Sequence, residues 1–224
     1  MEKRYVLFDW DNTVREGFTL FSWIDYLCDH AVIDIGLQKE MDVFKAQYGR
    51  HLITHDQYAE FACATYAAAL AGRPLDRLTG AVTEYMTHDR KCLFRNLGVL
   101  FDLLHEKGAD IIVISGAPVR ILDQYREDFN LKSIYAFREK VSQGLFTGEV
   151  EYNYGFNKKE TVFKLIEAYH SHPYMAFGDS ESDVPMLKNA THAFSVNHDI
   201  EGAQRVNIGP EGIGVELLRR IEAL

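Results

Sequence analysis

Two aspartates, Asp9 and Asp11, stand one residue apart directly after the apolar run 5–8. Such a run bounded by polar residues is typical of a buried strand of a parallel sheet, and ligands bind beyond the carboxyl ends of these strands. Two carboxylates this close repel each other unless a cation or a shared proton lies between them. Mg²⁺ is the cation that prefers such oxygen ligands. Taken alone, however, the pair is better interpreted as a turn or a helix cap.

The same arrangement recurs at two later points of the chain. A β-branched run ends at Ser115 and Gly116, and another apolar run ends just before Asp179, with Asp183 shortly after. Scattered acidic residues would be unremarkable, but these acids all lie at the ends of strand-like runs. We therefore interpret them as parts of one metal site at one edge of a sheet.

Four stretches of the chain resemble, in the same order, the four motifs of the haloacid dehalogenase (HAD) superfamily. They read VLFDWDNTV (6–14), VISGAP (113–118), GFNKKETV (155–162) and FGDSESDVPML (177–187). The last is the most specific, and the spacing resembles the phosphoserine-phosphatase-like branch, whose helical cap is inserted between the first and second motifs. The resemblance implies an α/β fold, with a Rossmann-like parallel sheet as the core and an inserted all-helical cap domain.

The pattern of apolar residues predicts how the chain divides between core and cap. Residues 16–92 have helical spacing and no strand pattern, so we expect four or five helices there, forming the cap domain. The core domain then comprises residues 1–15 and 93–224. Within it we predict a β-hairpin beside the main sheet at 141–150 and a last strand at 192–196.

The resemblance implies a role for each aspartate. Asp9 is expected to attack phosphorus and form an aspartyl phosphate. Asp11 would protonate the leaving alkoxide and then take a proton from the attacking water. Mg²⁺ would be held by the carboxylates of Asp9 and Asp179 and the backbone carbonyl of Asp11. Asp183 would support the metal directly or through water.

Other residues are expected to bind the phosphoryl oxygens. Ser115 offers a hydroxyl, Gly116 an amide, and a helix starting near Pro118 its N-terminal dipole, although this turn alone would be an ordinary strand-to-helix connection. Two adjacent lysines could supply the positive charge. The family pattern of glycine, two residues and lysine fits Lys158, and Lys159 is then interpreted as a solvated surface residue.

The substrate pocket is predicted from the residues that follow the two aspartates. Phosphoserine phosphatases typically carry a glutamate nine positions after the nucleophile, where this chain has Phe18, with Glu16 two residues earlier. We interpret most aromatic residues of the cap as packing, but Phe18, Phe21 and Trp23 lie close enough to overhang the site. The hypothesis is a pocket more apolar than that for phosphoserine. Ser182, where the branch often has asparagine, is a further departure.

Three functions from different classes fit these residues. The leading one is a Mg²⁺-dependent phosphatase that hydrolyses a small-molecule phosphomonoester, with the cap choosing the substrate. The second is a phosphotransferase or mutase that uses the same aspartyl phosphate. The third is a non-catalytic HAD-like binding protein, which is disfavoured because the aspartates, the serine and the lysine are all present.

Composition excludes several other classes. A net charge of −9 over 224 residues argues against a nucleic-acid surface. We see neither a signal-peptide pattern nor an apolar stretch that approaches a membrane span, so we expect a cytoplasmic protein without a membrane partner. The three cysteines fit no zinc spacing and are expected to be reduced. The oligomeric state is left open.

Overall fold

A seven-stranded sheet runs through the computed structural model, which describes residues 4–224. Its strands are β1 (Arg4–Phe8), β2 (Ala109–Pro118), β3 (Ser133–Ser142), β4 (Leu145–Tyr152), β5 (Met175–Gly178), β6 (His192–Val196) and β7 (Gln204–Val206). They are ordered β4-β3-β2-β1-β5-β6-β7, and every neighbouring pair is parallel except β3 and β4. Because β1 lies between β2 and β5, the carboxyl ends of these three strands are neighbours.

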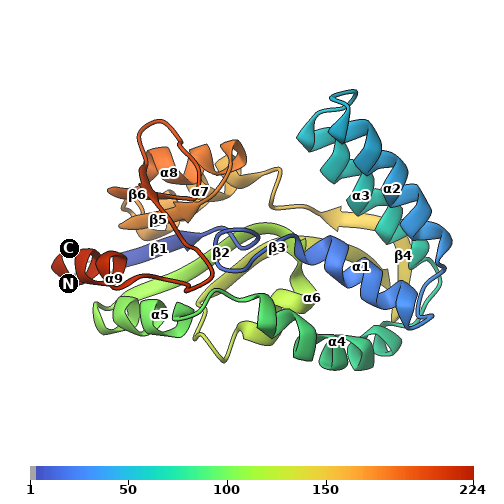
Figure 1. Cartoon of the computed structure of the whole chain (residues 1–224). Coiled ribbons are helices and arrows are strands. Elements are labelled where there is room, and N and C mark those ends of the chain that lie inside the picture. The colour runs from blue at the N-terminus through green and yellow to red at the C-terminus, as the bar shows by residue number, and fades with distance from the viewer. Residues whose placement is uncertain (1–3) are drawn as a thin grey trace.

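Helices cover both faces of the sheet (Figure 1). The helices of the described residues are α1 (Thr19–Asp29), α2 (Gly36–Gly49), α3 (His55–Ala69), α4 (Leu75–Asp89), α5 (Leu97–Glu106), α6 (Val119–Leu122), α7 (Lys158–Tyr169), α8 (Val184–Asn189) and α9 (Val215–Ala223). Helices α7 and α8 pack on one face, and α5, backed by α9, packs on the other. This mostly parallel sheet with flanking helices confirms the predicted α/β fold class. No helix in residues 4–224 combines the length and apolarity needed to cross a membrane.

Strand β1 shows why the sheet has two separate cores. Its side chains alternate between the faces, so Val6 and Phe8 join one apolar cluster whereas Tyr5 and Leu7 join the other. All four side chains are almost fully buried. A strand covered on both faces has no polar side, which is why its sequence is a continuous apolar run.

Helices α1–α4 are inserted between β1 and β2, in the stretch for which the sequence predicted four or five helices. Helix α3 begins with a capping box, in which the Thr54 hydroxyl accepts from the Gln57 amide and the Gln57 side chain accepts from the Thr54 amide. It packs against α2 on one side and against β4 on the other. The insertion therefore contacts the end of the sheet that carries the hairpin.

Three details differ from the sequence predictions. The hairpin does not lie beside the sheet but extends it, because β3 pairs with β2 before it turns back at Gln143 and Gly144. Both turn residues have positive φ, as a two-residue hairpin loop requires. The sequence predicted a helix starting near Pro118. Strand β2 instead continues through Pro118, and helix α6, which follows it, has only four residues. Strand β7 was not predicted, since three residues are too few to show a period.

Candidate active site

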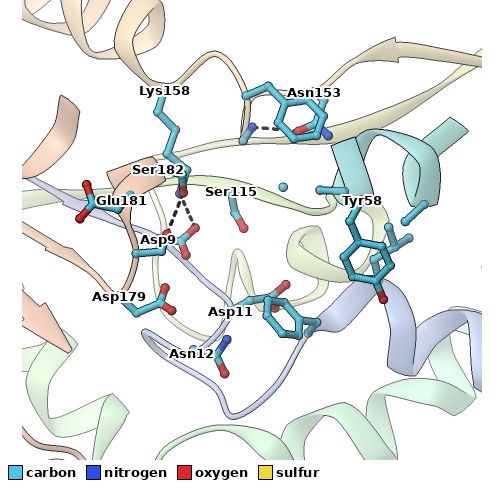
Figure 2. A pocket seen from close by; sticks show the side chains of 18 of the residues that line it. Asp9, Asp11, Asn12, Tyr58, Ser115, Asn153, Lys158, Asp179, Glu181 and Ser182 are labelled. Atoms are coloured by element: carbon cyan, nitrogen blue, oxygen red, sulfur yellow. Dashed lines mark hydrogen bonds and ion pairs between the residues drawn. The ribbon is translucent and has the colours of Figure 1, made fainter. Parts of the chain in front are cut away.

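Side chains from three neighbouring strand ends converge at one edge of the sheet (Figure 2). Asp9 follows β1, Ser115 lies in β2 near its carboxyl end, and Asp179 follows β5. Lys158, the first residue of α7, reaches the same point from above the sheet. The topology thus brings together residues up to 170 positions apart, as the sequence predicted from the ends of its apolar runs.

Lys158 lies between two carboxylates. Its Nζ donates to Oδ1 of Asp9 at 2.7 Å and to Oδ1 of Asp183 at 2.5 Å, and all three side chains are buried. Burial acts to lower the pKa of Lys158, but the charges of Asp183 and Asp9 outweigh it and raise this pKa. Lys159 is exposed on the next position of α7. Of the two candidate lysines, Lys158 is therefore the one that contacts the aspartates.

Asp183 holds the loop that carries Asp179. Its Oδ2 accepts from the backbone amides of Asp179 and Ser180, both at 3.0 Å, while its other oxygen faces Lys158. The loop passes so close that a Cβ added to Gly178 would lie 2.4 Å from the Cβ of Asp183. Only glycine fits at that position. Asp183 therefore positions both the lysine and the neighbouring aspartate.

Asp9, Asp179 and Asp183 each bring a carboxylate oxygen within 4.8 Å of the others. Burial raises the pKa of Asp9 to about 7, with Lys158 opposing the shift. Burial and the charge of Asp9 raise the pKa of Asp179 to about 8. This crowding of negative charge is what a divalent cation would relieve, and a set made only of oxygen donors suits Mg²⁺.

The carboxylate of Asp11 is held by the start of α1. Its Oδ1 accepts from the Thr19 amide at 3.0 Å and from the Thr19 hydroxyl at 2.5 Å. Burial raises the pKa of Asp11, and the nearby Arg15 guanidinium acts against it. These bonds hold the carboxyl outside the group of three carboxylates described above. Asp11 thus combines an elevated pKa with a position beside the cavity.

A buried polar cluster behind Asp11 was missed by the sequence reasoning. Arg15 is 1% exposed, and its guanidinium lies 3.6 Å from Asp11 and 3.5 Å from Asp89. Asp89 in turn accepts from the hydroxyls of Tyr85 at 3.0 Å and Tyr125 at 2.7 Å. An arginine in a loop is usually exposed, so no local pattern signals this cluster.

A second loop packs against the predicted phosphate-binding turn. Ser115 is buried, and its hydroxyl accepts from the Ala117 amide at 3.1 Å. The loop before α7 crosses here, where a Cβ added to Gly155 would lie 2.6 Å from the Cα of Gly116. Asn153 fixes the crossing by accepting from the Gly155 amide at 2.9 Å. Because α6 has only four residues, the predicted contribution of a helix dipole is not available here.

A cavity of about 560 Å³ lies over the aspartates. Its wall includes six of the seven predicted catalytic, phosphate-binding and metal residues. The seventh, Asp183, is fully buried. Phe18 and Phe21 also line it, as predicted. Glu16 and Trp23 do not. Those two pocket assignments are wrong for different reasons.

The position of Trp23 follows from helix geometry. Two residues of a helix that are two positions apart point in directions about 160° apart, so Phe21 and Trp23 cannot share a face. Trp23 is fully buried and donates its indole N–H to the hydroxyl of Tyr66 at 2.8 Å. Glu16 is exposed before α1 begins. Of the four predicted pocket residues, the two phenylalanines are therefore the ones that line the cavity.

Several lining residues were not predicted. They are Asn12, Leu20, Tyr48, Tyr58, Ala59, Ala62, Cys63, Asn153, Gly155, Phe156, Ser180, Glu181, Ser182, His198, Asp199 and Ile200. Tyr48 had been interpreted as packing. The spacing of Tyr58, Ala59, Ala62 and Cys63 is the one available signal, since it places one face of α3 over the site. The lining residues after β6, which are His198, Asp199 and Ile200, show no spacing that would predict their position at the cavity.

Comparisons with known proteins agree with this geometry. The model of the haloacid dehalogenase-like hydrolase family matches residues 6–188. The "Inhibition of morphological differentiation protein" of Streptomyces azureus is 30% identical over 152 residues, which are 65% of this chain and 54% of that protein. The chain thus spans about half the length of this curated relative.

Two solved structures share the fold. A protein of unknown function from Bordetella pertussis Tohama I superposes with a TM-score of 0.75 at 20% identity, over 92% of this chain and 99% of the other. A phosphoserine phosphatase, solved as an analogue of its phospho-aspartyl intermediate, superposes with a TM-score of 0.68 at 18% identity, over 98% of this chain and 99% of the other. At these identities the likeness concerns the arrangement of helices and strands.

Proposed function

Because the chain belongs to the haloacid dehalogenase-like hydrolase family, we propose that it is a Mg²⁺-dependent phosphatase that forms an aspartyl phosphate on Asp9. The observation that carries this proposal is the position of Lys158, whose ammonium lies 2.7 Å from Asp9 in a buried group of carboxylates. A carboxylate must be ionised to attack phosphorus. A lysine held against it stabilises that ionised form.

The donor set suits the metal that the family implies. Carboxylates of Asp9 and Asp179, with the backbone carbonyl of Asp11, would hold Mg²⁺, and Asp183 would support them. When bound, Mg²⁺ supplies positive charge that offsets the repulsion between the nucleophile and the phosphoryl oxygens. The Ser115 hydroxyl, the Gly116 amide and the Lys158 ammonium would bind those oxygens.

Asp11 is suited to act as the general acid and then as the general base. Burial raises its pKa, so the carboxyl can carry a proton when the ester binds. As the Asp9 oxygen bonds to phosphorus, the bond to the ester oxygen breaks, and that oxygen takes the proton of Asp11. The Asp11 carboxylate then takes a proton from water as the water oxygen attacks phosphorus, and the bond between the Asp9 oxygen and phosphorus breaks. This second step releases inorganic phosphate and restores both aspartates.

The inserted helices would choose the substrate. We propose a core domain of residues 1–15 and 93–224 and a cap domain of residues 16–92, which contributes the wall of the cavity that lies opposite the aspartates. The substrate would be a small phosphorylated metabolite of the cytoplasm. The phospho-aspartyl analogue formed by the phosphoserine phosphatase of similar fold supports the same chemistry.

The first test is hydrolysis of a generic aryl phosphate by the purified protein, with and without Mg²⁺. The Asp9→Asn variant keeps nearly the same shape but lacks the nucleophilic carboxylate. We expect activity that requires Mg²⁺ and is lost in the variant. Activity that survives in Asp9→Asn would contradict the proposed intermediate. Adding an alcohol as a competing acceptor separates hydrolysis from phosphoryl transfer, since transfer would yield a new phosphate ester.

A further inference from the structure

Aromatic rings of α1, α2 and α3, together with that of Phe18 directly before α1, form one wall of the cavity. Phe21 stacks on Tyr58 with ring centroids 5.2 Å apart and an interplanar angle of 12°. Tyr58 stacks on Tyr48 at 5.2 Å and 5°. Phe18 meets Phe21 edge to face at 6.0 Å. We call these four residues the aromatic wall, and Figure 2 shows Tyr58 opposite the aspartates.

Some of these rings are exposed to solvent. Phe18 is 48% exposed and Tyr48 is 38% exposed, and Phe156, which also lines the cavity, is 44% exposed. Single exposed apolar residues need no explanation, but several gathered around one cavity form the kind of patch that marks a ligand groove. Here the patch continues directly into the group of catalytic aspartates. A ligand that covered it would place its apolar part against the rings.

Positive charge is scarce in the cavity. Among the described residues that line it, Lys158 is the one lysine or arginine, and it is already paired with Asp9 and Asp183. Near the opening, Glu181 is exposed and Asp199 is paired with Arg205, which does not line the cavity. Once the phosphoryl group occupies the site, the described lining residues offer no further lysine or arginine to a second anionic group of the substrate.

The size of the cavity excludes a very small leaving group as the best fit. Its volume of about 560 Å³ lies within the usual range for sites that bind drug-sized ligands. The space exists because α3 presents small side chains, Ala59, Ala62 and Cys63, beside the aromatic wall. A two- or three-carbon alcohol would leave most of this apolar surface uncovered.

We infer that the preferred substrate is a phosphomonoester of an uncharged alcohol that carries an aromatic ring, and that a second negative charge on this alcohol is disfavoured. The inference rests on the proposed function and specifies its substrate class. The ring would pack on the aromatic wall while the phosphoryl group lies between Lys158 and Ser115. A flat ring is favoured over an alkyl chain because it matches stacked, nearly parallel rings.

Three matched esters test this inference. Benzyl phosphate carries the ring, ethyl phosphate lacks it, and 3-carboxybenzyl phosphate adds one negative charge to the same ring. All three release alkoxides of similar basicity, so differences in kcat/KM report on the cavity. We expect kcat/KM for benzyl phosphate to exceed that for ethyl phosphate by about tenfold or more, since one apolar group is worth that much in a fitted pocket. The carboxylate of 3-carboxybenzyl phosphate should remove most of this increase in kcat/KM.

Two variants assign the effect to the wall. Phe21→Ala should bring the benzyl-to-ethyl ratio of kcat/KM close to one, and thermal unfolding checks that the variant is folded. Phe18→Lys, at an exposed position, adds a cation at the opening and should improve 3-carboxybenzyl phosphate relative to benzyl phosphate. Phe163→Ala is the control, since Phe163 on α7 is exposed to a similar degree as Phe18 but does not line the cavity. It should leave all three ratios unchanged.

Binding of the corresponding non-hydrolysable phosphonates in Mg²⁺ separates this inference from the proposed function. A preference by calorimetry for 2-phenylethylphosphonate, in which a methylene group replaces the ester oxygen of benzyl phosphate, with no hydrolysis of any ester, would support the cavity assignment and overturn the phosphatase. Hydrolysis of all three esters at similar kcat/KM, or a preference for the ethyl or carboxybenzyl ester, would overturn the substrate class alone. Equal binding of all phosphonates without hydrolysis would overturn both.

Discussion

Nη2 of Arg15 lies 3.5 Å from Oδ1 of Asp89, and both side chains are almost fully buried. Arg15 follows β1, whereas Asp89 is the last residue of α4. The same guanidinium is 3.6 Å from Asp11 and donates to the Thr19 hydroxyl at 3.1 Å. The pair therefore links the end of the helical insertion to the proposed general acid.

Removing Asp89 should destabilise the protein strongly. Asp89→Ala would leave the charge of Arg15 and the hydroxyls of Tyr85 and Tyr125 buried without their shared partner. Breaking a buried ion pair in this way lowers the free energy of unfolding by about 3–5 kcal/mol. Urea unfolding measures the loss.

An exposed ion pair provides the control for Asp89→Ala. Asp128 pairs with Arg90 where both side chains are at least 40% exposed. Asp128→Ala should change the free energy of unfolding by about 1 kcal/mol or less. Equal losses for the two variants would contradict the assignment of a structural role to the buried pair.

Replacing Lys158 should abolish most activity. Lys158→Ala removes the ammonium that lies 2.7 Å from Asp9 and is proposed to bind the phosphoryl group. Loss of one such preorganised charge lowers kcat by about 10²–10³-fold. The matched control is Lys159→Ala, the exposed neighbour on the same helix, which should keep normal kcat and KM with an aryl phosphate. A Lys158 variant as active as this control would be incompatible with the proposed site.

The metal-free protein should lose stability as pH rises from about 4 to about 8. Aspartates of the unfolded chain lose their protons near pH 4, whereas the pKa of Asp9 is about 7 and that of Asp179 about 8 in the folded protein. Between these values the folded state binds more protons than the unfolded state, so the free energy of unfolding falls with pH. Urea unfolding in a chelator at several pH values measures this slope.

The matched variant for this slope is Asp179→Asn, which removes one of the raised pKa values. Its unfolding free energy should depend less steeply on pH above neutrality than that of the wild type. Mg²⁺ should stabilise the wild type most at the upper end of the range, because it binds ionised carboxylates. A wild-type stability that rose steadily from pH 4 to pH 8 in the chelator would refute the prediction.

Asp179→Asn should also change the metal requirement of catalysis. The variant keeps an oxygen ligand but loses one negative charge of the carboxylate group, so we expect half-maximal activity at a Mg²⁺ concentration about tenfold or more above that of the wild type. A Mg²⁺ titration of aryl phosphate hydrolysis measures the shift. Asp102→Asn, at an exposed position on α5, is the control and should leave the titration unchanged.

The parts of this site that could be predicted are those signalled by short stretches of neighbouring residues. Asp9 and Asp179 follow apolar runs that become β1 and β5, and parallel pairing brings such ends together whatever the length of chain between them. The family pattern of glycine, two residues and lysine, which fits Gly155 to Lys158, favoured Lys158 over Lys159, and Lys158 is the lysine buried against Asp9. The α/β fold itself was predicted from the resemblance of the four motifs to those of the haloacid dehalogenase superfamily.

The parts that could not be predicted depend on pairs of distant side chains. Arg15 and Asp89 are 74 positions apart, and neither has a neighbour in the chain that signals burial. Trp23 was misplaced because closeness to the aspartates in sequence says nothing about helix register. Tyr48 is recognised as part of the cavity only once α2 is packed against α3. Such contacts arise from tertiary packing, which one sequence does not display.

The contact between Gly155 and Gly116 brings the main chain of the loop before α7 directly against the main chain of the phosphate-binding turn. A single methyl group at Gly155 would lie 2.6 Å from the Cα of Gly116 and 2.7 Å from its backbone nitrogen, so two main chains would have to separate. Main chain cannot move aside by changing a rotamer as a flexible side chain can. Because residue 155, three positions before Lys158, has no side chain, the start of α7 can lie close enough for the Lys158 ammonium to contact the nucleophile.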